Sequence, residues 1–150
     1  MMKREILFRG KNKHGKWYYG YYTEGYYLDG TPVSWIEVVD RKKKDTECPT
    51  VIPNTGGQFT GLTDKNGKRA FEHDVIKHHF GDEIGVIRYG EYRNPFGDDS
   101  HGGHVGFYVD WVSGTEPGLL RKDLAYWMKI VEIIGNIHDN PELLGGVGDG

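Results

Sequence analysis

The 150-residue sequence predicts a mostly β fold with one short helix. Glycine accounts for 23 residues, about twice the ~7% of average proteins, whereas alanine occurs only at Ala70 and Ala125. Tyrosine and tryptophan are frequent, with 10 and 4 residues. Helix interiors favour alanine, strands favour aromatic side chains, and glycine is common in turns. The composition therefore favours short strands joined by tight turns.

The first third of the chain predicts four short strands. Residues 4–10 (REILFRG) alternate apolar side chains on two faces, and the closing glycine ends the run. Residues 16–30 are rich in tyrosine and predict an antiparallel strand pair with a tight turn at Glu24-Gly25. Residues 31–40 are apolar on both faces, which is typical of a covered strand.

The segment Gln58–Ile76 (QFTGLTDKNGKRAFEHDVI) raises the question of a metal loop or a turn. A calcium loop needs a further ligand two positions before Asp64 and a glutamate six positions after Gly67. The sequence has leucine at the first of these positions and His73 at the second. Asn66 and Gly67 both tolerate a positive φ, so the segment predicts a two-residue hairpin turn instead.

The second half predicts four more strands and one long loop. Residues 74–81 and 82–92 alternate as a strand pair, and residues 105–112 form a further strand. Residues 130–137 are almost continuously apolar, which favours a central strand. Residues 93–104 have no periodicity and predict a long mobile loop.

One helix and a frayed terminus complete the expected elements. Leu120, Leu124 and Trp127 recur at helical spacing, so a short helix is expected near residues 119–127. Residues 145–150 (GGVGDG) predict a flexible tail.

Three segments of the chain resemble the YopX family of small proteins encoded by phages and prophages. Residues 59–76 (FTGLTDKNGKRAFEHDVI) are similar to its TGL-D-NG-IYEGD-V signature. REILFRG near the start and VEIIGNIHDNPELL near the end follow in family order, so the resemblance spans residues 4–144. It implies coiled antiparallel sheets with an SH3-like small barrel in the C-terminal half. An N-terminal β lobe of about residues 1–57 is then expected to pack on a barrel region of about residues 58–144. The resemblance implies no established activity and no catalytic residues.

The chain departs from the family signature at Glu72-His73-Asp74, where the family usually has Glu-Gly-Asp. A glycine there suggests a positive φ, which histidine adopts only at a cost. Glu72 and Asp74 point to the same face of an extended segment. The pair is interpreted as accepting backbone N–H bonds near the start of a strand, with a ligand-binding role for Glu72, His73 and Asp74 as the alternative.

The remaining polar clusters give little ground for catalysis. His101 and His104, close to Asp98, are ligand types that zinc accepts, but the intervening glycines favour a hydrated flexible loop. We therefore expect no metal site and no cofactor, with these three residues as weak metal candidates. The single cysteine, Cys48, excludes an intrachain disulfide and has no catalytic signature around it. No enzymatic activity is indicated.

Binding to a protein is the favoured function. The run YYGYYTEGYY has six tyrosines in ten residues, more than one face of a hairpin can bury, and tyrosine suits interfaces. The chain is expected to form a homo-oligomer or to bind a phage or host protein. The residues assigned to this surface are Tyr21, Tyr22, Tyr26 and Tyr27.

Nucleic-acid binding is the alternative. The basic run RKKK, which contains Lys42 and Lys43, and the run KNKHGK lie beside aromatic strands, where bases stack and phosphates meet cations. The net charge of −3 gives no general attraction to nucleic acid. The N-terminal residues include no long apolar run, so a protein of the bacterial cytoplasm without membrane association is expected.

Overall fold

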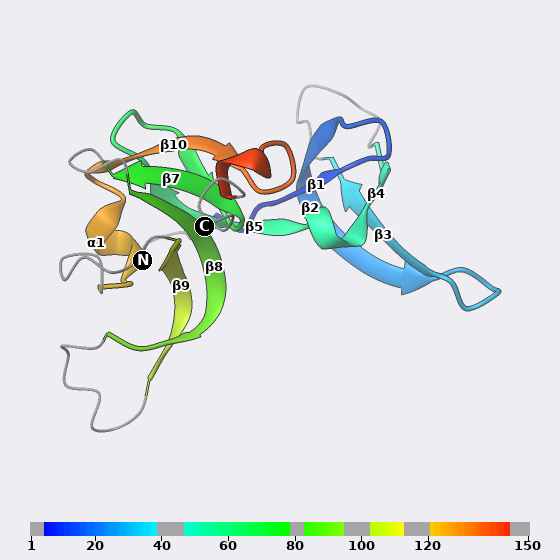
Figure 1. Cartoon of the computed structure of the whole chain (residues 1–150). Helices are drawn as coiled ribbons and strands as arrows, with labels where there is room; N and C mark the ends of the chain where they lie inside the picture. Colours follow the sequence, from blue (N-terminus) through cyan, green and yellow to red (C-terminus); the bar gives the residue numbers. More distant parts are fainter. Residues whose placement is uncertain (1–4, 39–46, 79–82, 95–102, 113–120, 145–150) are drawn as a thin grey trace. The chain divides into compact units, whose positions relative to one another are not determined.

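The computed structural model describes residues 5–38, 47–78, 83–94, 103–112 and 121–144. It has two antiparallel sheets and only short helical turns, which confirms the β-rich fold class (Figure 1). The chain divides into two compact units, Met1–Gly61 (unit 1) and Leu62–Gly150 (unit 2). No helix in the described ranges has the length and apolar character needed to cross a membrane.

Most of the named elements are short strands, with the short helices η1 and α1 between them. In chain order they are β1 (Phe8–Lys11), β2 (Trp17–Tyr26), β3 (Pro32–Glu37), β4 (Thr50–Val51), η1 (Pro53–Thr55), β5 (Gly57–Thr63), β6 (Arg69–Phe71), β7 (Asp74–His78), β8 (Ile84–Tyr92), β9 (His104–Trp111), α1 (Leu124–Trp127) and β10 (Val131–Asn136). The first sheet has the order β4-β3-β2-β1-β5-β6, and the second has the order β10-β7-β8-β9.

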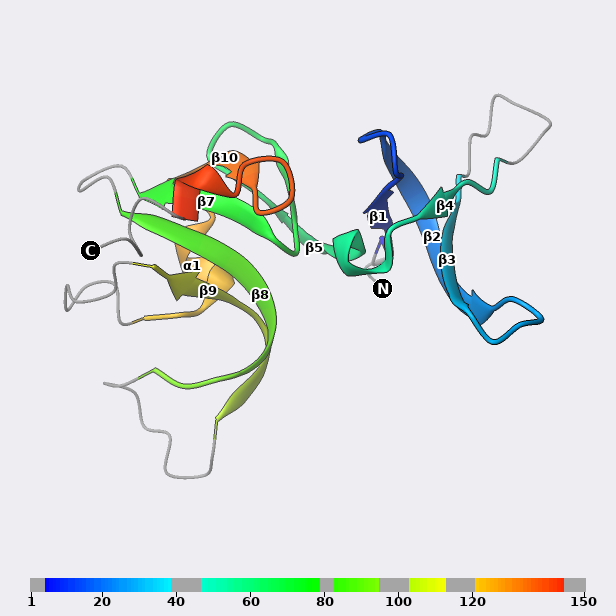
Figure 2. The same ribbon diagram turned by 45° about the vertical axis from the view of Figure 1, so that its right-hand side comes forward.

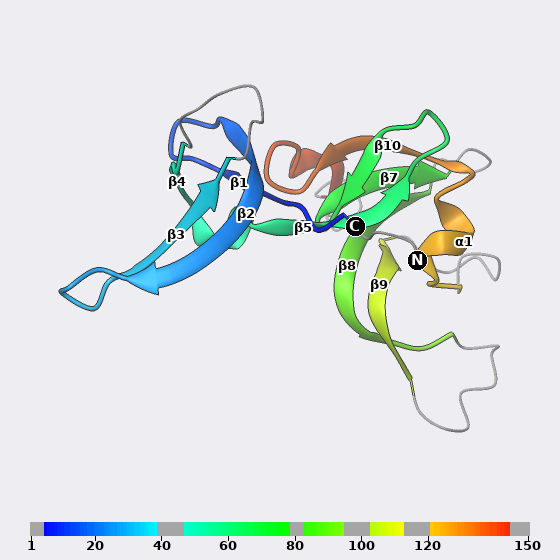
Figure 3. The ribbon, with the colours of Figure 1, turned by 180° about the vertical axis from the view of Figure 1, so that it is seen from behind.

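Unit 1 is dominated by the β2–β3 hairpin, a long twisted ribbon visible from behind in Figure 3. The expected tight turn at Glu24-Gly25 is wrong, because β2 continues through both residues as far as Tyr26. The chain reverses at residues 27–31, where Tyr27 N–H donates to the carbonyl of Thr31 and Gly30 has a φ of +87°. An Asp-Gly pair is a strong hairpin signal, so the aromatic run concealed the true turn.

Gly10 lies inside β1 and does not end it, contrary to the expectation from the sequence. It pairs with Tyr18 of β2. A Cβ at this position would lie 2.8 Å from Cγ2 of Val51, which is buried on the same sheet. The glycine is therefore required by the close approach of a core side chain, not by a turn.

The turn between β5 and β6 is built on Asp64. Gly67 N–H donates to the carbonyl of Asp64, and Asp64 N–H donates to the carbonyl of Lys68. Gly67 has a φ of +82°, whereas Asn66 has no positive φ. The predicted hairpin is present, but its loop has three residues, the pattern of a type I turn followed by one left-handed residue.

Unit 2 contains the curved sheet β10-β7-β8-β9. Figure 2 shows β8 bending strongly along its length, with α1 on the concave side of the curve. The strand order of the described residues ends at β10 and β9 without closing. Unit 2 therefore has an open, curved sheet where the family resemblance implied an SH3-like barrel. No closed barrel is found in the described part of the chain.

The core of unit 2 lies between this sheet and α1. Its buried members are Ala70, Ile76, Ile87, Val109, Trp111, Leu124, Trp127, Met128, Val131 and Ile133. The helix itself is shorter than expected, because residues 121–123 are extended along β9. Val109 N–H donates to the carbonyl of Lys122, and Asp123 forms a bridge with Tyr108. Leu124 and Trp127 then enter the core from the single turn of α1.

Strand β10 lies at an edge of its sheet, not at the centre as its apolar sequence suggested. Its outer edge is covered by the β5–β6 turn instead of by another strand. Ile133 N–H donates to Oδ2 of Asp64, and Lys65 N–H donates to the carbonyl of Val131. An apolar strand can remain at a sheet edge when its backbone groups are bonded in this way.

Candidate functional site

The β2–β3 hairpin with its turn, residues 17–37, exposes a set of aromatic side chains and is called the aromatic hairpin. The relative exposures of Tyr21, Tyr26 and Tyr27 are 52%, 77% and 54%. Tyr22 differs from them, because it is half-buried and its hydroxyl lies 2.9 Å from both Ser34 Oγ and Glu24 Oε1. Three of the four predicted tyrosines thus face solvent, and Tyr22 belongs to the packing of the hairpin.

Tyr27 lines two grooves in unit 1. One has a volume of about 490 Å³ and the other a volume of about 400 Å³. The larger groove is also lined by Pro32 and Val33, by residues 49–53 and by the turn at residues 12–14. Exposed rings beside apolar grooves are the features by which protein interfaces anchor a partner.

Cations cover several aromatic rings on β1 and β2. The guanidinium carbon of Arg9 lies 4.8 Å from the ring centre of Trp17, and Lys11 Nζ lies 5.9 Å from the same ring. Lys16 Nζ lies 5.0 Å from the ring centre of Tyr18. Cations and aromatic rings are thus adjacent on these two strands. Lys42 and Lys43, the basic residues expected to meet phosphates, lie outside the described residues.

The turn at Glu72-His73-Asp74 contains the single non-glycine residue with a positive φ in the described structure, His73 at +76°. Its backbone is held on both sides: His73 N–H donates to the carbonyl of Ile87 at 2.7 Å, and Ile137 N–H donates to the carbonyl of His73 at 3.1 Å. A left-handed histidine costs about 1–2 kcal/mol and persists where its surroundings fix it.

The side chain of His73 contacts a second histidine. Its Nδ1 lies 3.2 Å from Nε2 of His138, and the two rings meet edge to face with centres 5.1 Å apart. On the other side of the His73 ring, Nε2 lies 3.7 Å from Oε2 of Glu72. Asn136 positions His138, because its Oδ1 accepts the N–H groups of both His138 and Asp139.

Asp74 has a structural role in this turn. Its carboxylate is almost fully buried and its Oδ2 accepts the N–H of Phe71 at 2.8 Å. A buried carboxylate that accepts a backbone donor stabilises a turn and is poorly placed to meet a ligand. Glu72 and His73 are partly exposed, so they remain the candidates for binding in this segment.

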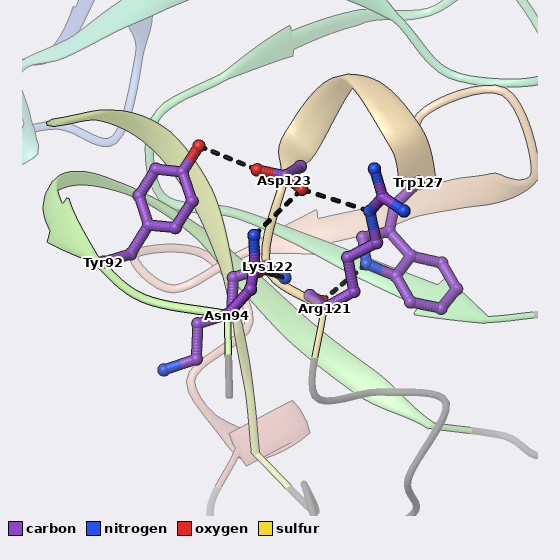
Figure 4. A network of polar contacts seen from close by, with 6 residues as sticks. All are labelled: Tyr92, Asn94, Arg121, Lys122, Asp123 and Trp127. Carbon is purple, nitrogen blue, oxygen red and sulfur yellow. Dashed lines mark hydrogen bonds and ion pairs between the residues drawn. The ribbon is translucent and has the colours of Figure 1, made fainter. Parts of the chain in front are cut away.

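A polar network around Asp123 joins β8, β9 and α1 (Figure 4). Tyr92 donates its hydroxyl to Oδ1 of Asp123 at 3.0 Å, while Asn94 Nδ2 and Arg121 Nε reach Oδ2 at 3.1 Å each. Trp127 Nε1 donates to the carbonyl of Arg121 at 2.8 Å. This network could not be predicted from the sequence, because its members lie up to 35 positions apart and share no motif.

Replacing Asp123 by asparagine is expected to lower the pKa of Tyr92. Burial, then the hydrogen bond from Tyr92 to Asp123 and the charge of that carboxylate, raise the pKa of Tyr92 to about 12. A raised tyrosine pKa gives stability below the ordinary value of about 10 that is lost as the pH rises towards 12. The ¹³Cζ shift of Tyr92 followed by NMR checks this; Asp110→Asn, which removes the partner of Arg88, is a control that should leave the Tyr92 pKa in place.

Two of the three residues expected as weak metal candidates, Asp98 and His101, lie outside the described residues. The third, His104, is exposed and stacked on Tyr92 with ring centres 5.2 Å apart. Across the described ranges, no group of three or more histidine, cysteine, aspartate or glutamate residues is arranged to hold a metal ion.

Comparison with known protein families shows the family to which the chain belongs. The model of the YopX protein family matches residues 7–145. The chain belongs to the YopX family. The crystal structure of protein EF1440 from Enterococcus faecalis is similar, with a TM-score of 0.50 and 19% sequence identity over 95% of this chain and 99% of that chain. At this identity the likeness concerns the fold. Comparison with curated proteins gave no match.

His73 stands in the turn where the family resemblance led us to expect glycine. Its φ of +76° is one that glycine adopts without strain. The histidine adopts the same left-handed backbone conformation. What it adds is a side chain directed at His138, which lies 65 positions away and could not be connected with it from the sequence.

Proposed function

We propose that this YopX protein acts without catalysis, by binding another protein through its aromatic hairpin. The observation that carries the proposal is the exposure of Tyr21, Tyr26 and Tyr27 on one hairpin beside two grooves. Tyrosine buries a large area at an interface while its hydroxyl keeps a hydrogen bond. The setting is the cytoplasm of the bacterial host, where the protein serves as an accessory of a phage or prophage.

A second copy of the chain is the first partner to test. The exposed rings and the grooves lie on the same unit. An exposed ring of one copy can therefore insert into a groove of a second copy. In a two-fold symmetric dimer each such contact occurs twice, which doubles the gain from one side chain. A phage or host protein that presents a complementary surface is the other partner of this hairpin.

The double variant Tyr21→Ala, Tyr26→Ala is expected to weaken self-association while leaving the fold intact. Both rings are more than half exposed, so their truncation costs the monomer little. At an interface the same change should raise the dissociation constant about 30-fold, equivalent to about 2 kcal/mol. Sedimentation velocity on protein without a histidine tag measures the effect, and native mass spectrometry gives the subunit number.

Tyr89→Ala is the matched control, since Tyr89 is similarly exposed but lies on β8 of unit 2. Unchanged association in the double variant, or equal loss in the control, rules out the aromatic hairpin as the interface. Co-purified nucleic acid that is lost steeply with salt and with Lys42→Glu, Lys43→Glu would instead support the nucleic-acid alternative.

A further inference from the structure

The pair formed by His73 and His138 has a spacing that fits a shared metal ion. His73 Nδ1 and His138 Nε2 are 3.2 Å apart. Two imidazole nitrogens on one tetrahedral zinc ion are about 3.3 Å apart, because each Zn–N bond is about 2.0–2.1 Å long. The observed spacing also lies at the long end for a direct hydrogen bond. A metal ion accounts for the distance at least as well as a bridging proton does.

We propose that His73 and His138 bind one divalent transition-metal ion through Nδ1 and Nε2, with water in the remaining coordination positions. Imidazole ligands suit zinc, copper and nickel and do not suit magnesium or calcium. The described residues contain no cluster of three or more metal-ligating side chains, so this part of the chain supplies two ligands. Copper is expected to bind most tightly, following the general order of divalent metals.

Both ligands are held in place before any ion arrives. The backbone of His73 is bonded to Ile87 on one side and to Ile137 on the other. His138 sits in a turn that the buried side chain of Asn136 fixes through its Oδ1. Two ligands positioned by separate, anchored turns need little reorganisation to share an ion.

Glu72 is placed to orient His73 without itself binding the metal ion. Its Oε2 faces Nε2 of His73 at 3.7 Å, on the ring nitrogen that does not face His138. Metal-binding histidines commonly direct their second ring nitrogen towards a carboxylate, which favours the proton on that nitrogen and leaves the other free to bind. The carboxylate thus favours the tautomer in which Nδ1 of His73 carries the lone pair.

Zinc titration of the full chain without a tag, followed by calorimetry, tests the site. We expect one binding event that weakens at least 10-fold in His73→Gly and in His138→Gln. Glycine suits the φ of +76°, so the first variant keeps its turn, and circular dichroism confirms the fold of both. With copper, electron paramagnetic resonance should show two coordinated nitrogens in the native chain and fewer in each variant.

The variant His101→Ala, His104→Ala is the matched control, because it removes two histidines and leaves the pair intact. Zinc binding that is retained in this control and lost in His73→Gly supports the site. Binding that is lost in the control but unchanged in both pair variants overturns it, and so does the absence of zinc binding to the native chain. Neither result bears on the proposed role of the aromatic hairpin, because none of these variants changes a residue within 17–37.

Discussion

Asp64→Asn is expected to lower the free energy of unfolding of unit 2 by about 3 kcal/mol, because it breaks a buried set of charge-assisted hydrogen bonds. Asp64 is 5% exposed. Its Oδ1 accepts the N–H groups of Asn66 and Lys68, at 2.8 and 2.9 Å, and its Oδ2 accepts the N–H of Ile133 at 2.9 Å. An asparagine that keeps its oxygen towards the turn must present its NH₂ group to the N–H of Ile133, which sets two donors against each other.

The effect of this substitution should depend on pH. Burial disfavours the charged carboxylate of Asp64, but the hydrogen bonds from Ile133, Lys68 and Asn66, with the positive charge of Lys68, outweigh it and lower the pKa. A lowered carboxyl pKa gives stability that is present above the ordinary value and is lost as the pH falls through the folded value. The native chain and the variant should therefore differ most at neutral pH and converge in strong acid.

Asp29→Asn is the matched control for Asp64→Asn. Asp29 also serves a hairpin turn, where its Oδ1 accepts the N–H of Thr31 at 2.9 Å, but it is exposed. Urea unfolding of both variants at neutral pH gives the comparison. An unfolding free energy for Asp64→Asn equal to that of the control would show that the contact with Ile133 does not stabilise β10.

Asp64 also shows which features the sequence could predict and which it could not. The spacing of Asp64, Asn66 and Gly67 was sufficient to reject a calcium loop and to predict a hairpin. It could not show that the same carboxylate covers the edge of β10, since Ile133 lies 69 positions away. The apolar run of residues 130–137 therefore predicted a central strand, because edge protection by a distant turn leaves no local pattern.

The candidate sites were likewise only partly predictable from the sequence. The surplus of tyrosines was visible in the sequence, and the exposure of Tyr21, Tyr26 and Tyr27 follows from it. The unusual histidine was visible too, as a departure from a family glycine. Its partner His138 was not, because the contact depends on a turn at residues 136–140 that returns the chain to the start of β7.

Gly20→Ala is expected to destabilise unit 1 by about 3 kcal/mol, through overpacking against backbone that cannot move alone. A Cβ on Gly20 would overlap the carbonyl oxygen of Glu37 and lie 2.8 Å from its carbonyl carbon. It would also lie 3.1 Å from Cγ2 of the fully buried Ile36. The clash is relieved only if β2 and β3 separate at this end, which removes the pairing of Tyr21 with Glu37.

The four tryptophans allow this effect to be localised. Trp17 and Trp35 lie in unit 1, whereas Trp111 and Trp127 lie in unit 2. Labelling with 5-fluorotryptophan gives one ¹⁹F signal for each ring, so each unit is followed by two probes during urea unfolding. In Gly20→Ala the midpoint of the unit 1 signals should fall while the unit 2 signals keep theirs.

Gly25→Ala is the control that separates a clash from the loss of glycine as such. Gly25 lies on the same strand, but a Cβ there meets only the ring of Trp35 at 3.4 Å, an ordinary contact distance. Alanine also restricts the unfolded chain more than glycine does, so this variant should be neutral or slightly more stable. If both variants unfold alike, the approach of Glu37 to β2 is not a constraint. If only Gly20→Ala unfolds early, a single glycine in the tyrosine run is what lets β3 pack on β2 and present the exposed rings on one stable hairpin.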